Sequence, residues 1–321
     1  MNRLAGGLLA AVTAVLLVLP AVLGSRALAL FVFIFFYAYL GQAWNLISGY
    51  AGQLSAGHAA FVGVGAYTAT VLSVHAGISP WLGMFAGAAL AALLGGVVGL
   101  LGFRFGLRGF YFALLTVAFA EVCRIVALNT EAIGGAVGLY IPFTGDPWQL
   151  QFQDNRGYYY VALGLMVLAT SVVALVARSR LGAYLAAIRE DEDAAEAAGV
   201  DTFRYKLIAI ALSAFLTGLG GAFYANYLFS LQPNTVFGIP FSVDIVLRPI
   251  VGGSGTLMGP ILGSFILSPL AELSRSYFAR AGLVGTHLVA YGLLLIAVVL
   301  FLPRGAAPLV ARALGLGKED A

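Results

Sequence analysis

Residues 180–206 read RLGAYLAAIREDEDAAEAAGVDTFRYK, and long apolar segments flank this stretch on both sides. The stretch holds 10 of the 31 Asp, Glu, Lys and Arg residues of the chain. Two apolar spans that hold a charged segment at a membrane surface present it to soluble proteins. The stretch therefore predicts a docking element for a soluble partner, which makes this chain one part of a larger assembly.

The same stretch has a helical pattern. The residues that would share one stripe of a helix are spaced by four, three and four positions: Leu185, Arg189, Glu192 and Glu196. The small residues Ala197 and Ala198 precede Gly199, which occupies the position of a C-cap glycine. Asp191 offers an alternative, because it can cap a second short helix through residue 198. A solvated connector is the competing interpretation, but a connector has no need of this periodicity.

The composition indicates a membrane protein. Of the 321 residues, 61% are hydrophobic and 10% are charged, and the mean hydropathy is +0.96. A soluble domain carries about 25% charged residues, so this chain has too little polar surface for water. The net charge of +3 argues against a nucleic-acid surface. The single cysteine, Cys123, lies in an apolar run, where packing is its expected role.

A membrane span needs about 20 apolar residues. Runs of this kind predict an all-α polytopic protein with about ten transmembrane helices, at 5–23, 28–48, 58–75, 81–102, 109–128, 158–178, 205–230, 238–252, 257–277 and 284–302. The eighth run is short and reads as a broken or re-entrant piece, which leaves nine as the alternative. The first run resembles a secretory signal, yet its length favours a retained span. The whole chain, 1–321, is expected to be one transmembrane domain.

Basic residues predict the orientation, because they accumulate on the cytoplasmic side. Those around the central stretch place the loop of about 179–206 in the cytoplasm, and ten spans then put both termini there as well. The loop of about 129–157, with three acidic residues and one arginine, is expected outside.

Glycines recur at spacings that suit close helix packing, in the pairs Gly83/Gly87, Gly95/Gly99, Gly218/Gly221 and Gly259/Gly263. Two further glycine-rich, polar segments, 49–58 and 252–260, interrupt the apolar pattern in the two halves of the chain. Paired interruptions of this kind point to a transport pathway, and ordinary turns between spans are the alternative. The pathway candidates are Gly52, Gln53, Ser55, His58, Gly253, Gly255 and Thr256. For His58 the competing role is a hydrogen bond to backbone at a helix end.

Catalytic motifs are missing from the sequence. Neither Lys206 nor Lys318 fits a phosphate-binding loop, and the three histidines form no zinc motif. The chain is therefore expected not to be an enzyme, and ATP-driven transport would need ATPase activity from another chain. Two charge pairs, Glu121/Arg124 and Asp244/Arg248, fall within predicted spans. A stand-alone secondary transporter, which is the alternative to an ATP-driven one, would need buried charges of this kind. However, no dense proton relay accompanies these two pairs.

Five segments together resemble the permeases of bacterial ABC importers, and within these the branched-chain amino-acid permeases of the M-type (LivM-like). The segments are WNLISGYAGQLSAGHAAFVGVGAYTA (44–69), LRGFYFALLTVAFAE (107–121), IGGAVGL (133–139), SRLGAYLAAIREDEDAAEAAGVDTFRYK (179–206) and IVGGSGTLMGPILG (250–263). The resemblance covers most of the chain, from about residue 44 to about residue 304.

The resemblance implies a permease core of the larger importer type in a bacterial or archaeal plasma membrane. It identifies 181–199 as a coupling helix that docks on an ATP-binding subunit, with Glu196, Ala197, Ala198 and Gly199 as its signature. The implied partners are a second permease subunit, two ATP-binding subunits that hold ATP and Mg²⁺, and an external solute-binding protein. The implied cargo is leucine, isoleucine and valine, with urea, short amides or sugars as the alternative. The acidic run at 190–193 departs from the family pattern.

Overall fold

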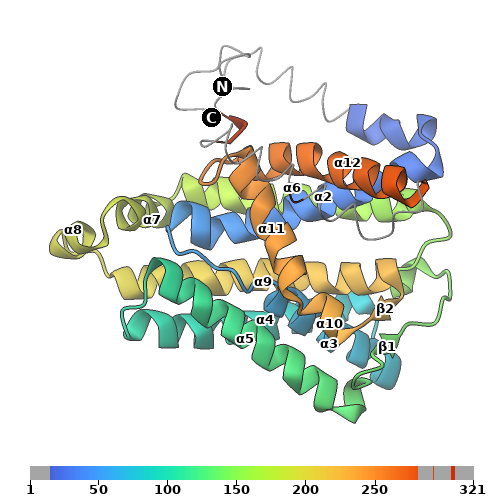
Figure 1. Ribbon diagram of the computed structural model, residues 1–321, viewed down its shortest axis with the longest axis horizontal. Helices are drawn as coiled ribbons and strands as arrows, with labels where there is room; N and C mark the ends of the chain where they lie inside the picture. Colours follow the sequence, from blue (N-terminus) through green and yellow to red (C-terminus); the bar gives the residue numbers. More distant parts are fainter. Residues whose placement is uncertain (1–14, 281–291, 293–304, 308–321) are drawn as a thin grey trace.

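The computed structural model describes residues 15–280, 292 and 305–307. It is almost entirely helical (Figure 1). The long helices are α2 (Ser25–Asn45, continued by the π-helical turn η1, Leu46–Tyr50), α3 (Ala59–Ala76), α4 (Pro80–Arg104), α5 (Gly109–Asn129), α6 (Asn155–Ala177), α9 (Thr202–Leu228), α11 (Ile239–Gly252) and α12 (Gly259–Arg280). The shorter ones are α7 (Arg180–Glu190), α8 (Glu192–Ala197), α10 (Pro233–Val236), η2 (Glu131–Ile133) and η3 (Pro147–Gln149).

Within the described residues, seven helical segments are long and apolar enough to cross a membrane. They match the second to eighth predicted spans, so the chain is a multi-pass membrane protein. The ninth predicted span is helix α12, which is not among the seven. Residues 15–22 of the first predicted span are helical. The rest of that span, and the tenth except for Gly292, lie outside the described residues, so the total of about ten stays a prediction.

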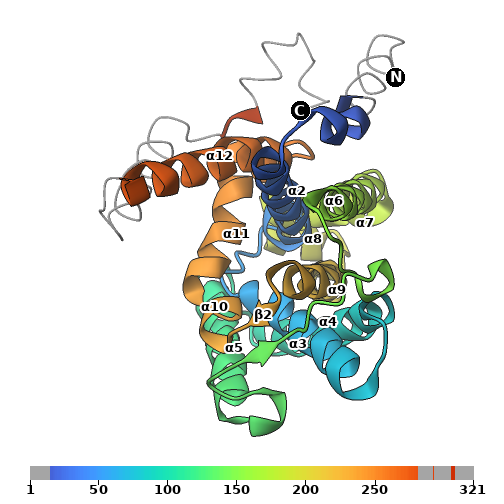
Figure 2. The same cartoon turned by 90° about the vertical axis from the view of Figure 1, so that its right-hand side faces the viewer.

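Helix α9 is the central element of the bundle. It packs against α3 and α4 on one side and against α2 on the other, and α6 and α12 cover α2 (Figure 2). Glycines permit the closest of these contacts: a Cβ atom on Gly65 of α3 would lie 2.1 Å from the carbonyl oxygen of Gly218 in α9. Gly87 of α4 approaches the backbone of Gly65 in the same way. The predicted packing role of the glycine pairs is confirmed for all members except Gly259, which meets the turn directly before its own helix.

Helix α11 differs from the other long helices in direction. Figure 1 shows that it runs across the bundle, whereas α2, α9 and α12 run along it. Its 14 residues are preceded by the short helix α10. The predicted eighth span is therefore broken, as one of its two interpretations held: α10 and α11 are separate helices that together form one of the seven candidate spans.

The two ends of the bundle carry different structures. Helices α7 and α8 lie at one end, and strands β1 (Leu139–Tyr140) and β2 (Ser230–Leu231) lie at the opposite end (Figure 1). The strands pair antiparallel, with Leu139 opposite Leu231. The pairing ties the loop between α5 and α6 to the segment that follows α9. Which end faces the cytoplasm stays a prediction from the basic residues.

Candidate functional site

The charged stretch folds as two helices rather than one. The Asp191 carboxylate accepts hydrogen bonds from the backbone N–H groups of Asp193 and Ala194, both at 3.0 Å, and so caps α8. The chain leaves α8 through Gly199, whose φ of +86° lies in the left-handed region that favours glycine. The structure therefore adopts the alternative prediction, in which Asp191 caps a second short helix. The predicted position of Gly199 at the C-terminal end of that helix is confirmed.

Only part of the predicted stripe of α7 and α8 faces the bundle: Leu185 and Glu192 do, whereas Arg189 and Glu196 are exposed. Leu185 is completely buried, together with Ile188 and Ala195, in a cluster with residues of α4, α5 and α9. The outer face carries small and acidic residues, which are all exposed: Ala183, Ala187, Glu190, Asp193, Ala194, Ala197 and Ala198. Leu185 thus holds the helix pair on the spans, and the surface open to another protein is the face on the other side.

Glu192 joins three segments by ion pairs. Its carboxylate lies 3.2 Å from Nε of Arg108, in the loop between α4 and α5, and it also pairs with Nζ of Lys206 in α9. Lys206 is only 2% exposed, and its ammonium lies 4.8 Å from the centre of the Phe103 ring. The acidic run is therefore matched by basic groups of this same chain. Sequence reasoning missed both basic partners, although a lone lysine at the start of an apolar run was a usable signal.

Asp193 adds an outer pair to this network. Its Oδ1 lies 2.9 Å from Nη2 of Arg108. The hydrogen bond from Arg108 holds the pKa of the Asp193 carboxyl below its usual range, and the same bond raises the pKa of Arg108. Both groups are charged at neutral pH, so an exposed ion pair joins α8 to the α4–α5 loop.

Arg189 reaches from α7 toward the first interrupted segment. Its Nη1 donates a hydrogen bond to the carbonyl oxygen of Gly49, at 3.1 Å, and its Nη2 pairs with Glu190 at 2.9 Å. The stem of Arg189 packs on Gly52, where a Cβ atom would lie 3.0 Å from its Cγ. Glu196 accepts a hydrogen bond from Oγ1 of Thr202 at 2.8 Å. All four residues of the predicted signature are exposed: Glu196, Ala197, Ala198 and Gly199.

The two interrupted segments meet each other at this point. Asn45 is the connecting residue: its Nδ2 donates to the carbonyl oxygen of Thr256 at 2.9 Å, and its Oδ1 accepts from the N–H of Gly255 at 2.8 Å. Gly255 also lies against Arg189, since a Cβ atom there would come within 2.6 Å of Nη1. The π-helical turn of η1 directly follows Asn45, and such turns are frequent at functional sites. The structure thus brings the predicted pathway residues Gly52, Gly255 and Thr256 together with the coupling stretch. Asn45, which connects them, was not among the residues predicted from the sequence.

The second segment is closed by its own hydrogen bonds. Oγ1 of Thr256 donates to the carbonyl oxygen of Gly253 at 2.8 Å and accepts from the N–H of Gly259 at 3.0 Å. Gly253 has a φ of +123° and is buried. This side-chain-stabilised turn begins α12, and it keeps the backbone of 253–256 in contact with η1.

His58 lies apart from this junction, between two serine hydroxyls. Its Nδ1 is 2.7 Å from Oγ of Ser55, and its Nε2 is 2.9 Å from Oγ of Ser213. Ser213 uses its single hydroxyl hydrogen on the carbonyl oxygen of Ala43, at 2.6 Å, so Nε2 must be the donor to Ser213. Nδ1 then accepts from Ser55, which defines one neutral tautomer. His58 and Ser55 are both fully buried, and His58 links the first segment to α9 through side chains rather than backbone. Gln53 is also buried.

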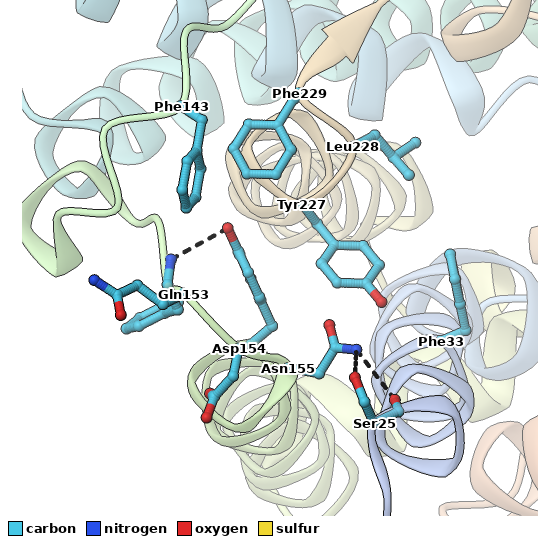
Figure 3. Close-up of a pocket in the computed structure, with 11 residues that line it drawn as sticks. Ser25, Phe33, Phe143, Gln153, Asp154, Asn155, Tyr227, Leu228 and Phe229 are labelled. Atoms are coloured by element: carbon cyan, nitrogen blue, oxygen red, sulfur yellow. Dashed lines mark hydrogen bonds between the residues drawn. The ribbon is translucent and has the colours of Figure 1, made fainter.

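A pocket of about 480 Å³ opens at the end of the bundle that carries the strands (Figure 3). Its walls come from α2, α6, the end of α9 and the loop before α6. Phe143 and Phe229 face each other edge to face at 5.4 Å, and Tyr227 and Phe33 continue the aromatic lining. Asn155 donates a hydrogen bond to the backbone carbonyl oxygen of Ser25 at 3.1 Å, which joins α6 to α2 at the rim. No local pattern in the chain predicted this pocket, because its residues are scattered over four segments.

Comparison with known proteins gives one family and several relatives. The family described as branched-chain amino acid transport system / permease component matches residues 26–302. The chain is 27% identical to the high-affinity branched-chain amino acid transport system permease protein LivM of Escherichia coli K12, over 85% of this chain and 68% of that protein. It is also 27% identical to LivM of Salmonella typhimurium LT2, over 89% and 71% respectively. The ribose import permease protein RbsC of Haemophilus influenzae is 26% identical over 40% of this chain and 46% of its own length. No solved structure matches the chain significantly.

Proposed function

Because this chain belongs to the family of branched-chain amino acid transport system permease components, we propose that it forms, with a second permease subunit, the membrane pathway of an ATP-driven importer of branched-chain amino acids. The two LivM relatives carry this cargo in their names and are similar along most of the chain, whereas the ribose permease is similar over less than half of it. This difference in coverage favours amino acids over sugars.

The helix pair α7–α8 is the proposed docking element for the ATP-binding subunits. Its outer face consists of alanines and acidic side chains, which leave room for a partner surface to come close. Its inner face is anchored on the spans by Leu185 and by the ion pairs of Glu192. A helix pair anchored in this way moves as a rigid body when its partner moves.

Arg189 is the proposed link between this docking element and the pathway. It contacts Gly49 and lies against Gly255, so a displacement of α7 acts on both interrupted segments at once. We place the inner gate of the pathway at this junction, with Gly52, Gly253, Gly255 and Thr256 as its backbone. Gln53, Ser55 and His58 support the gate from the bundle side. This contact of Arg189 with both segments is the observation that carries the proposal of coupling.

Membership of the family supports the proposed assembly. The proposed partners are the second permease, two ATP-binding subunits that hold ATP and Mg²⁺, and an external solute-binding protein that selects the cargo. The proposed location is the plasma membrane of a bacterium or archaeon, with α7–α8 and both termini on the cytoplasmic side. The aromatic pocket of Figure 3 would then open outward, toward the solute-binding protein.

Co-expression with the neighbouring genes and purification through a tag on this chain tests the proposal. We expect two ATP-binding subunits and a second permease to co-purify, and the complex in liposomes to take up leucine only with ATP and the binding protein. Recovery of this chain alone, with ATP-independent uptake, would instead establish a gradient-driven transporter.

Two variants test the docking element itself. Glu196→Ala removes the hydrogen bond with Thr202, and Gly199→Ala strains a left-handed position. Both are expected to reduce uptake per ATP hydrolysed without reducing membrane insertion. Glu131→Gln and Gly164→Ala are the matched controls, because Glu131 lies in the loop at the other end of the bundle and a Cβ atom on Gly164 would meet nothing within 4 Å. Wild-type coupling in both test variants would refute this role.

A further inference from the structure

A second pocket, of about 300 Å³, lies between α2, α11 and α12. Its charged lining residues include Asp244 and Arg248 of α11 and Glu272 of α12, and its apolar lining includes Phe33 and Tyr37 of α2. The volume is at the lower end of the range for small-ligand sites. Such a pocket is suited to one small molecule with both charged and apolar parts.

Arg248 is the most constrained group in this pocket. It is only 2% exposed, and its guanidinium lies 3.4 Å from the centre of the Tyr37 ring. Its Nη1 lies 3.4 Å from a carboxylate oxygen of Asp244, the residue one turn earlier. Its Nε has no hydrogen-bond partner. A buried donor without a partner is costly and rare in proteins, so this nitrogen points to a missing acceptor.

Ser268 provides a second group of the same kind. Ser268 lines the pocket from α12 and is 5% exposed, and its buried hydroxyl has no hydrogen-bond partner. Two buried polar groups on different helices, Arg248 and Ser268, are therefore available to one ligand in the same cavity.

We propose that this pocket binds the α-carboxylate and α-ammonium groups of an apolar amino acid during its passage, an inference that rests on the proposed function. The carboxylate takes the open donors of Arg248 and Ser268. The ammonium group lies against Asp244 and Glu272, and the aliphatic side chain lies on Phe33. This assigns ligand contacts within the permease itself, in addition to those of the solute-binding protein.

Charge balance supports a zwitterion over other ligands. The pocket is lined by two acidic side chains, Asp244 and Glu272, and two basic ones, Arg26 and Arg248. A zwitterion keeps this set neutral, whereas an anion or a cation leaves one charge without compensation in a medium of low dielectric constant. A neutral sugar needs none of these four charges.

The position of the pocket agrees with a pathway. Helix α11 runs across the bundle (Figure 1), and Figure 2 shows α12 on the side of α2 away from α3, α4 and α5, with α11 leading from α12 past α2 toward α10 and α5. Intramembrane charges face a bundle interior or a water-filled cavity rather than lipid. The outward surfaces of α4 and α5, with exposed Leu93, Phe110 and Val126, have the apolar character that lipid requires. The four charged residues that line the pocket therefore place it along the pathway in this proposal.

The first test locates the ligand in the complete importer. The purified complex with its binding protein, in liposomes with ATP, is supplied with a diazirine analogue of leucine and illuminated. We expect labelled peptides from α2, α11 and α12, and we expect excess leucine to suppress the labelling. Leucine-suppressible labelling confined to other segments of this chain, or found only on the other subunits, would overturn the inference.

The second test uses Arg248→Gln, with Arg124→Gln as a matched control at the end of α5, where Arg124 pairs with Glu121 outside this pocket. Leucine uptake in Arg248→Gln should fall at least about tenfold, while ATP hydrolysis stimulated by the binding protein stays near the wild-type rate. Normal uptake would overturn the inference, and an equal loss of uptake and ATP hydrolysis would assign Arg248 a structural role. Ser268→Ala, which removes one hydroxyl, is expected to raise the concentration of the diazirine analogue needed for photolabelling, and this variant is used if Arg248→Gln does not assemble. Failure of the wild-type complex to take up leucine at all would refute the proposed function instead.

Discussion

Arg189 and Gly49 are separated by 140 residues in the chain, yet Nη1 of Arg189 donates a hydrogen bond to the carbonyl oxygen of Gly49 at 3.1 Å. The contact joins the last turn of α7 to the π-helical turn that ends the first long helix. The helix proposed for docking is thereby connected to the backbone of an apolar, span-length helix by one side chain.

Replacement of Arg189 tests this connection. Arg189→Gln removes the contact with Gly49 and the packing on Gly52, so we expect ATP hydrolysis to continue while leucine uptake falls. Arg204→Gln is the control, because Arg204 is exposed in the first turn of α9. The ratio of leucine taken up to ATP hydrolysed, measured in liposomes, should drop only in Arg189→Gln, and an unchanged ratio would contradict the proposed link.

The ion pairs of Glu192 predict an asymmetry in stability. Glu192→Gln leaves the buried ammonium of Lys206 without an anion, and breaking a buried pair in this way costs about 3–5 kcal/mol. Lys206→Met should cost less, because Glu192 keeps Arg108 and the methionine fills the space beside Phe103. Thermal unfolding in detergent measures both. Equal losses would show that the buried ammonium is not the decisive group.

The pair of Asp193 and Arg108 predicts a pH dependence. The pKa of Asp193 is lowered in the folded protein, so its contribution to stability is complete above the ordinary aspartate pKa of about 3.9 and is lost as the pH falls through the lower, folded value. This pair should therefore show no titration between about pH 5 and pH 9, because the carboxyl is already ionised from about one pH unit above its pKa. Carboxyl NMR of labelled aspartate should show the pKa of Asp193 rising toward its ordinary value in Arg108→Gln. An unchanged pKa in that variant would rule out the hydrogen bond as the cause.

Two glycines predict opposite outcomes for the same substitution. Gly65→Ala places a methyl group 2.1 Å from the carbonyl oxygen of Gly218, so α3 and α9 must separate, and overpacking of this kind costs about 1–3 kcal/mol. Gly96→Ala in α4 meets nothing within 4 Å and should be neutral or slightly stabilising, because alanine is the better helix former. The yield of folded protein and the unfolding midpoint distinguish the two. A Gly65→Ala protein as stable as Gly96→Ala would contradict the close approach of these helices.

Local features of the sequence were sufficient for the helices and for several of their ends. The runs of apolar residues predicted the seven helices that are long and apolar enough to cross a membrane, because the free energy of transfer to lipid depends on the composition of about 20 consecutive residues. Asp191 and Gly199 predicted the ends of α8, because caps act on backbone groups within a few positions. The spacing of Gly218 and Gly221 predicted close packing, since both lie on one side of a helix.

Partners across the bundle were decided by the tertiary structure alone. The periodicity of α7 placed Leu185 and Arg189 on one stripe, but it did not say whether that stripe faces the spans or a soluble partner. That choice depends on Lys206, Arg108 and Gly49, which approach α7 and α8 only after α4, α5, α9 and η1 have packed. The meeting of Asn45 with Gly255 has the same origin, since 210 residues separate them. Apolar length and helix caps are properties of neighbouring residues, whereas these contacts follow from how the helices cross.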